Sequence, residues 1–135
     1  MQIFENHKMI LKMKWVIFLV IVIATGIPWW ITNYHQYTGS ILYTITSVII
    51  CGIASLILTF ITAHKKVKIV FYSCAALMVA FLIKVYIDGR EDPTNHNLVP
   101  FEMVIIGAVG LLACTIGAII GTLLQPIFLK KVANN

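Results

Sequence analysis

The chain is poor in charge, and in acidic charge above all. Of its 135 residues only 11% are charged, with five Asp and Glu against ten Lys and Arg, whereas 60% are hydrophobic. A soluble domain of this size carries about twice that share of charged residues. Together with a mean hydropathy of +0.94, this composition argues against a water-exposed globular domain and for an integral membrane protein.

Sequence motifs that define enzymes are also missing. The chain has no nucleophile elbow, no HExxH and no pair of intramembrane catalytic residues, so we expect no enzyme activity and no cofactor. Its three cysteines, Cys51, Cys74 and Cys114, fall in apolar runs without CxxC spacing. Quinone-linked thiol oxidases need paired cysteines in accessible loops, which disfavours that class. We expect free thiols that pack as small apolar groups, and whether Cys51 touches Cys114 stays open.

Four long apolar runs account for most of the chain. They cover residues 14–31, 41–63, 67–87 and 103–129. Each is near or above the roughly 18 to 20 residues that a helix needs to cross the hydrocarbon core of a bilayer. The prediction is an all-α, integral membrane four-helix bundle with up-down topology, in which residues 1–135 form a single domain with short loops. The order of the helices around the bundle stays open, because this topology allows more than one arrangement.

Positive charge is sorted to alternate ends of these runs. Eight of the ten basic residues fall on one side: Lys8, Lys12, Lys14, Lys65, Lys66, Lys68, Lys130 and Lys131. Short loops rich in Lys and Arg stay in the cytoplasm, so we predict a multi-pass protein of the cell membrane with both termini cytoplasmic (N-in/C-in). The basic residues then contact anionic headgroups of the lipid bilayer. We expect no nucleic-acid partner, because this placement already accounts for the charge.

The fourth run has a face of small residues. Gly107, Gly110, Gly117 and Gly121 fall within one arc of the expected helix, and the last two form a GxxxG pair. Small side chains allow close helix approach in lipid, where no hydrophobic force draws helices together. We predict that this face packs tightly, and we favour packing within the bundle over packing across a dimer.

The second run has a polar stripe at steps of three or four residues. It consists of Thr44, Ser47, Cys51, Ser55, Thr59 and Thr62. Such a stripe either lines a polar pathway or packs against another helix, with each hydroxyl bonded to the carbonyl four residues earlier. Because no acidic or basic side chain lies among these residues, we favour the packing interpretation.

The outer end of the third run contains an ionisable residue, Lys84. It lies about one turn from the end of the run, so its stem can reach toward water. Asp88 is a partner at four residues' distance, and we favour a Lys84–Asp88 ion pair over a ligand-binding lysine. Trp29 and Trp30, at the outer end of the first run, are expected in an interfacial aromatic belt.

The segment 88–102 between the third and fourth runs is dense in polar groups. Asp92 and Pro93 predict a turn that closes the end of the bundle. Pro100 is expected where the fourth helix begins, with Glu102 in its first turn. As an alternative, four of its side chains are candidates for a metal or small-ligand site: Asp88, Asp92, His96 and Glu102. An imidazole with carboxylates suits zinc or manganese, and carboxylates with carbonyls suit calcium. The spacing matches no defined metal motif.

Residues 92–102 read Asp-Pro-Thr-Asn-His-Asn-Leu-Val-Pro-Phe-Glu. This string resembles a loop, Asp-Pro-Thr-x-His-Asn-Leu-x-Pro-Phe-Glu, that recurs before the last span of small, uncharacterised four-span membrane proteins of Gram-positive bacteria. The resemblance rests on these residues, the chain length and the number of spans. It implies a fold and a bacterial plasma membrane, and it implies no activity.

These features favour a non-enzymatic accessory or interaction protein of the bacterial plasma membrane. Its partners would be the lipid bilayer and either a larger membrane protein or further copies of itself. The first alternative is a homo-oligomeric small transporter or channel. Four-span multidrug exporters match in size, but their membrane-embedded glutamate has no counterpart here, and dual-topology fluoride channels need a near-zero Lys/Arg bias. The second alternative is a metal or ligand site in the outer segment 88–102.

Overall fold

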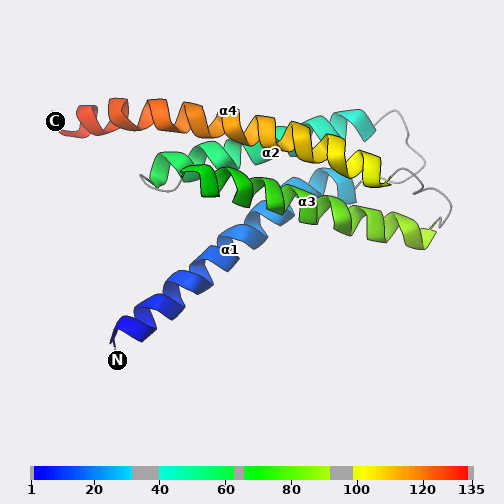
Figure 1. Cartoon of the computed structure of the whole chain (residues 1–135), viewed down its shortest axis with the longest axis horizontal. Helices are drawn as coiled ribbons and strands as arrows, with labels where there is room; N and C mark the ends of the chain where they lie inside the picture. Colours follow the sequence, from blue (N-terminus) through cyan, green and yellow to red (C-terminus); the bar gives the residue numbers. More distant parts are fainter. Residues whose placement is uncertain (1, 32–39, 63–65, 92–98, 134–135) are drawn as a thin grey trace.

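The computed structural model describes residues 2–31, 40–62, 66–91 and 99–133, and these residues form four α-helices without a strand. The helices are α1 (Gln2–Trp30), α2 (Ser40–Ile61), α3 (Lys66–Glu91) and α4 (Val99–Ala133) (Figure 1). Each contains a segment long and apolar enough to cross a membrane. The prediction of an all-α bundle of four membrane-spanning helices is therefore confirmed.

The helices extend beyond the apolar runs at several ends. The expected loop 88–102 begins later than predicted, because residues 88–91 continue α3. Its other end agrees with the expectation that the fourth helix begins near Pro100, because α4 begins at Val99 with Glu102 in its first turn. An apolar run marks only the part of a helix that hydrocarbon requires, and a helix can continue into the headgroup region. Pro100 is the second residue of α4, where a missing backbone N–H breaks no intrahelical hydrogen bond.

The order of the helices around the bundle, which the sequence left open, is α1, α2, α4 and α3. Among the described residues α1 contacts α2 and α3 but not α4, while α4 contacts both α2 and α3. The two middle helices of the chain, α2 and α3, also touch each other across the bundle. In Figure 1, α2, α3 and α4 run side by side, whereas the amino-terminal part of α1 diverges from them.

The most extensive interface joins α2 and α4, which run in the same direction. Gly117 and Gly121 of α4 face the backbone of α2 at Gly52 and Leu56. A Cβ atom added to Gly121 would lie 2.5 Å from the Leu56 carbonyl oxygen, and one added to Gly117 would overlap the Gly52 carbonyl. The GxxxG pair thus packs inside the bundle, because only glycine allows this approach of two backbones.

Much of the interior, on the side of α1 and α3, consists of small or well-packed apolar side chains. Leu77, Ala76 and Ala80 of α3 are fully buried, and Phe81 packs edge-on against Trp29 of α1 with ring centroids 5.7 Å apart. The opposite faces carry exposed aliphatic side chains at helical spacing, such as Ile45, Ile49, Ile53 and Ile57 of α2 and Leu112, Ile116, Ile119 and Leu123 of α4. Water would disfavour such continuous apolar faces, and lipid accommodates them.

Candidate functional site

A polar column runs through the interior of the bundle along α2. It comprises Ser47, Cys51, Ser55 and Thr59, and all four side chains have 0% exposure. The stripe that the sequence predicted is thus a single buried face in its central part. Its two ends differ, because Thr44 is half-buried and Thr62 is exposed.

The neighbouring helices add polar side chains to this column. The Ser55 hydroxyl donates a hydrogen bond of 2.8 Å to the Cys114 carbonyl of α4. The Cys51 thiol lies 3.1 Å from the Ser73 carbonyl of α3 and 3.2 Å from the Cys114 sulfur. Cys114 and Ser73 are themselves fully buried. The column therefore ties α2 to both α3 and α4 near the centre of the bundle.

The expected hydrogen bonds to carbonyls four residues earlier do not account for this column. Such bonds occur elsewhere, at Thr25, Thr46, Thr115 and Thr122. The Ser55 hydroxyl instead crosses to another helix. The interpretation that α2 packs along this stripe agrees with its burial, but the predicted bonding pattern was wrong for Ser55. Close contact with α4 brings a carbonyl of a second helix within reach, and one sequence cannot reveal that contact.

Three hydroxyls of the column region lack a partner. The Ser47, Thr59 and Ser73 hydroxyl oxygens are buried and make no hydrogen bond with the described part of the chain. An unpaired buried hydroxyl destabilises a fold by about 1–3 kcal/mol relative to a paired one. These groups are small and uncharged at neutral pH, so the column can accept and donate hydrogen bonds but offers no strong acid or base.

The three cysteines are free thiols, all of them buried. Cys51 and Cys114 are in direct contact, which settles the question that the sequence left open. Cys74 lies apart from this pair and directs its thiol toward the Gly107 carbonyl at 3.7 Å. The signal in the sequence was that Cys51 belongs to the stripe of α2 and Cys114 to the glycine face of α4. Finding their contact required the order of the helices.

The four predicted packing glycines lie at two different interfaces. Gly117 and Gly121 face α2, whereas Gly107 and Gly110 face Met78 and Leu77 of α3. Gly52 of α2 is a fifth packing glycine that the sequence did not predict, and a Cβ added to it would lie 3.2 Å from the Ala113 carbonyl oxygen of α4. Gly52 directly follows Cys51 in the sequence and so borders the polar stripe of α2. That position could have identified Gly52 as a packing residue.

The carboxyl-terminal part of α3 carries the charged pair that the sequence suggested. The Lys84 ammonium lies 2.7 Å from the Asp88 carboxylate, and Asp88 is buried, with 8% exposure. Two residues after Asp88, the Arg90 guanidinium donates a hydrogen bond to the Tyr86 hydroxyl and lies over its ring. These contacts hold both basic side chains along α3, close to the polar end of its span.

Trp29, which the sequence predicts in an interfacial belt, packs between helices. It is 5% exposed, and its indole N–H lies 3.3 Å from the Thr44 hydroxyl of α2. The Trp30 indole N–H reaches the Ala80 carbonyl of α3 at the same distance. Both rings thus join helices inside the bundle, because an indole buried in protein needs a hydrogen-bond acceptor.

The metal site predicted in segment 88–102 is described only in part. Asp92 and His96 lie outside the described residues. Asp88 is engaged by Lys84, and Glu102 is exposed in the first turn of α4. Within the described ranges, no group of three or more His, Cys, Asp or Glu side chains is placed to hold a metal ion.

What the described residues place together is therefore a buried column of hydroxyls and thiols, flanked by glycine contacts. The carboxyl-terminal part of α3 adds the Lys84–Asp88 ion pair. Such a site supports helix association and interhelical hydrogen bonding. Comparison with known proteins adds no further assignment, because no protein-family model, curated protein or solved structure matches the chain.

Proposed function

We propose that this chain is a non-enzymatic accessory protein of a bacterial plasma membrane that acts by lateral contact with a larger membrane protein. The proposal rests on which side chains face the interior of the bundle and which face outward. Small and polar groups such as Ser47 and Ser55 fill a closed interior, whereas long aliphatic groups such as Ile53 and Leu112 face outward. A protein with this distribution has its reactive groups enclosed and its outer faces free for contact within the bilayer.

The exposed isoleucine row of α2 is the first face to test. A photo-crosslinking amino acid at Ile53 would report its neighbours in the native membrane, and one at Val48, which is buried, is the matched control. The proposal expects one discrete protein adduct from position 53, its loss in an Ile49→Trp variant, and no adduct from position 48. A second photo-crosslinking position, Leu112, tests the exposed face of α4. Adducts with lipid alone from both positions 53 and 112 would contradict the proposal.

The proposed orientation has both termini in the cytoplasm. It is supported by the Lys and Arg bias of the short loops, and the resemblance of residues 92–102 to a loop of Gram-positive membrane proteins supports a bacterial plasma membrane. Single cysteines introduced at Asn135 and Asn95 test it, in a chain whose native cysteines are replaced by alanine. A membrane-impermeant maleimide should label only position 95 in intact cells. Labelling of position 135 alone would show the opposite orientation and contradict the proposed one.

A homo-oligomeric transporter or channel is the second candidate, and the unpartnered Ser47, Thr59 and Ser73 hydroxyls favour it. Unpaired hydroxyls along one column could coordinate a permeating ion once the helices separate. Native mass spectrometry of the purified protein tests for a discrete oligomer, and ion flux into sealed vesicles tests for activity. Metal analysis of the same sample, compared with His96→Ala, tests the outer site of segment 88–102.

A further inference from the structure

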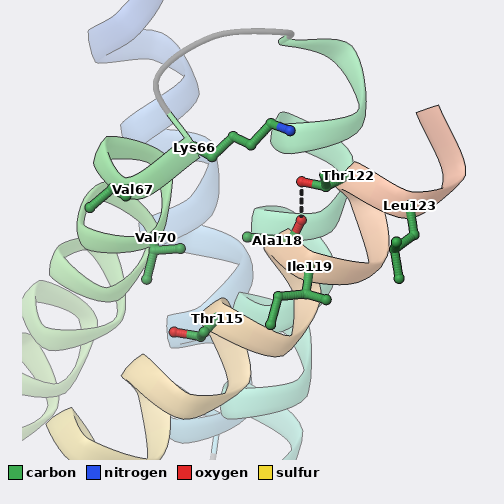
Figure 2. Close-up of a pocket in the computed structure, with 8 residues that line it drawn as sticks. All are labelled: Lys66, Val67, Val70, Thr115, Ala118, Ile119, Thr122 and Leu123. Atoms are coloured by element: carbon green, nitrogen blue, oxygen red, sulfur yellow. Dashed lines mark hydrogen bonds between the residues drawn. The ribbon is translucent and has the colours of Figure 1, made fainter. Parts of the chain in front are cut away.

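An open groove lies between α3 and α4 at the end of the bundle where α3 begins. Its volume is about 250 Å³, and its walls include Lys66 and Val70 from α3 and Ala118, Ile119 and Thr122 from α4. Figure 2 shows the two helices flanking the groove, with the Lys66 side chain extending across its end toward Thr122. The small Ala118 lies in the α4 wall and Val70 in the α3 wall.

The walls of the groove are apolar despite its two threonines. The Thr115 hydroxyl donates to the Leu111 carbonyl at 2.7 Å, and the Thr122 hydroxyl donates to the Ala118 carbonyl at 2.8 Å. Each hydroxyl proton is thus used within α4. The groove therefore suits a hydrocarbon chain better than a polar solute, because a polar solute would find few free donors along its length.

The end of the groove is positively charged. Lys66 is the first residue of α3, where unpaired backbone N–H groups and the helix dipole also favour an anion. The acidic residues of α3 and α4, namely Asp88, Glu91 and Glu102, lie at the opposite ends of these helices. A cation at the mouth of an apolar groove matches a ligand with an anionic head and a hydrocarbon tail.

We propose that this groove is a binding site for an anionic phospholipid, with an acyl chain against Val70 and Ile119 and the phosphate at Lys66. The chemistry of the two ends selects this class of ligand. A free phosphate would leave the apolar walls uncovered, and a fatty chain without a charge would leave the Lys66 ammonium unmatched. The site does not depend on the accessory role proposed above, since a transporter with the same helices would contain it.

Lys68 provides a matched control for Lys66. Both lysines lie in the first turn of α3, but Lys68 is exposed and does not line the groove. The test is native mass spectrometry of protein extracted from vesicles of equimolar phosphatidylglycerol and phosphatidylcholine. Lys66→Gln should lower the ratio of retained phosphatidylglycerol to phosphatidylcholine about fivefold, the effect of one lysine near an anionic headgroup. Lys68→Gln should change the ratio less than about twofold, because its charge acts only from outside the groove.

A second variant tests the groove itself. Ile119 is 54% exposed, so Ile119→Trp is expected to fold and to fill the groove, and it should reduce retention of both lipids. Helix content by circular dichroism checks folding of each variant. Equal effects of the two lysine substitutions, or unchanged retention in Ile119→Trp, would overturn the site. Displacement of the lipid by millimolar inorganic phosphate would also overturn it, because headgroup attraction alone would then hold the lipid.

Discussion

The sulfur atoms of Cys51 and Cys114 lie 3.2 Å apart, and neither side chain has any exposed surface. This contact lies where α2 and α4 run alongside each other, next to the hydrogen bond from Ser55 to the Cys114 carbonyl. Two parallel helices cannot be joined by a short loop, and here the whole of α3 lies between α2 and α4 in the chain. Side-chain and backbone contacts must therefore fix the register of α2 against α4.

The first prediction concerns the thiol pair. Oxidation of the purified protein with a membrane-permeant diazene such as diamide should join Cys51 to Cys114, because the sulfurs need to move only roughly 1 Å to reach disulfide distance. Thiol alkylation after denaturation, read by mass spectrometry, should then find one reactive cysteine instead of three. Cys74→Ala should leave the cross-link intact and Cys51→Ala should abolish it. A cross-link that involves Cys74, or one between two chains, would contradict the contact.

The second prediction concerns the glycine contacts. Gly117→Ala should lower the free energy of unfolding by about 1–3 kcal/mol, because the new methyl group overlaps backbone atoms of α2 that cannot move independently. Gly107→Ala is the matched control on the same helix. Its added methyl group would lie 3.6 Å from the flexible Met78 side chain, so a change below about 0.5 kcal/mol is expected.

Both variants can be measured by unfolding in mixed micelles with increasing denaturing detergent. Alanine favours a helix over glycine, so any loss at position 117 reflects packing and not helix propensity. Equal stability of the two variants would mean that α2 and α4 do not approach as closely as their backbones indicate.

The third prediction concerns the ion pair near the carboxyl-terminal end of α3. Asp88→Asn preserves the shape of a buried side chain but removes the charge opposite Lys84. It should destabilise the protein by about 1–3 kcal/mol, the range for a buried group that loses its partner. Glu102→Gln removes the same charge from an exposed site and should change stability by less than about 0.5 kcal/mol.

A double variant separates the ion pair from simple loss of charge. Lys84→Met with Asp88→Leu replaces both partners by apolar groups, which often restores stability that a single replacement loses. The double variant should therefore be more stable than Asp88→Asn in the same detergent titration. If it is less stable, Lys84 matters mainly through contacts other than Asp88.

Helical period and residue size made the buried faces predictable, but they did not identify the neighbours of those faces. The stripe that contains Ser47 and Ser55 and the glycine face that contains Gly117 could be placed because each repeats every three or four residues. Which helix each face meets depends on the order of the helices, and up-down topology permits several orders. That is why the Cys51–Cys114 contact and the partner of Ser55 could not be predicted.

The end of α3 and the contact of Trp29 with α2 were missed for a different reason. Hydropathy reports which residues tolerate hydrocarbon, and it is insensitive to a helix that continues past its apolar run, as α3 does beyond residue 87. The position of Trp29 at the end of an apolar run does not reveal its hydrogen bond to Thr44, because that partner belongs to the next helix.

The fourth prediction separates paired from unpaired hydroxyls of the polar column. Ser55→Ala removes the hydrogen bond to the Cys114 carbonyl and should destabilise the protein by about 0.6 kcal/mol, the average for a hydrogen bond between helices in a membrane. Ser47→Ala removes a buried hydroxyl that has no partner, so it should leave stability unchanged or raise it. The comparison uses the same substitution on one face of α2, so side-chain volume and helix propensity cancel. A loss at position 47 as large as that at position 55 would mean that the Ser47 hydroxyl has a partner, such as a bound water or ion, and that the column is a site as well as a packing surface.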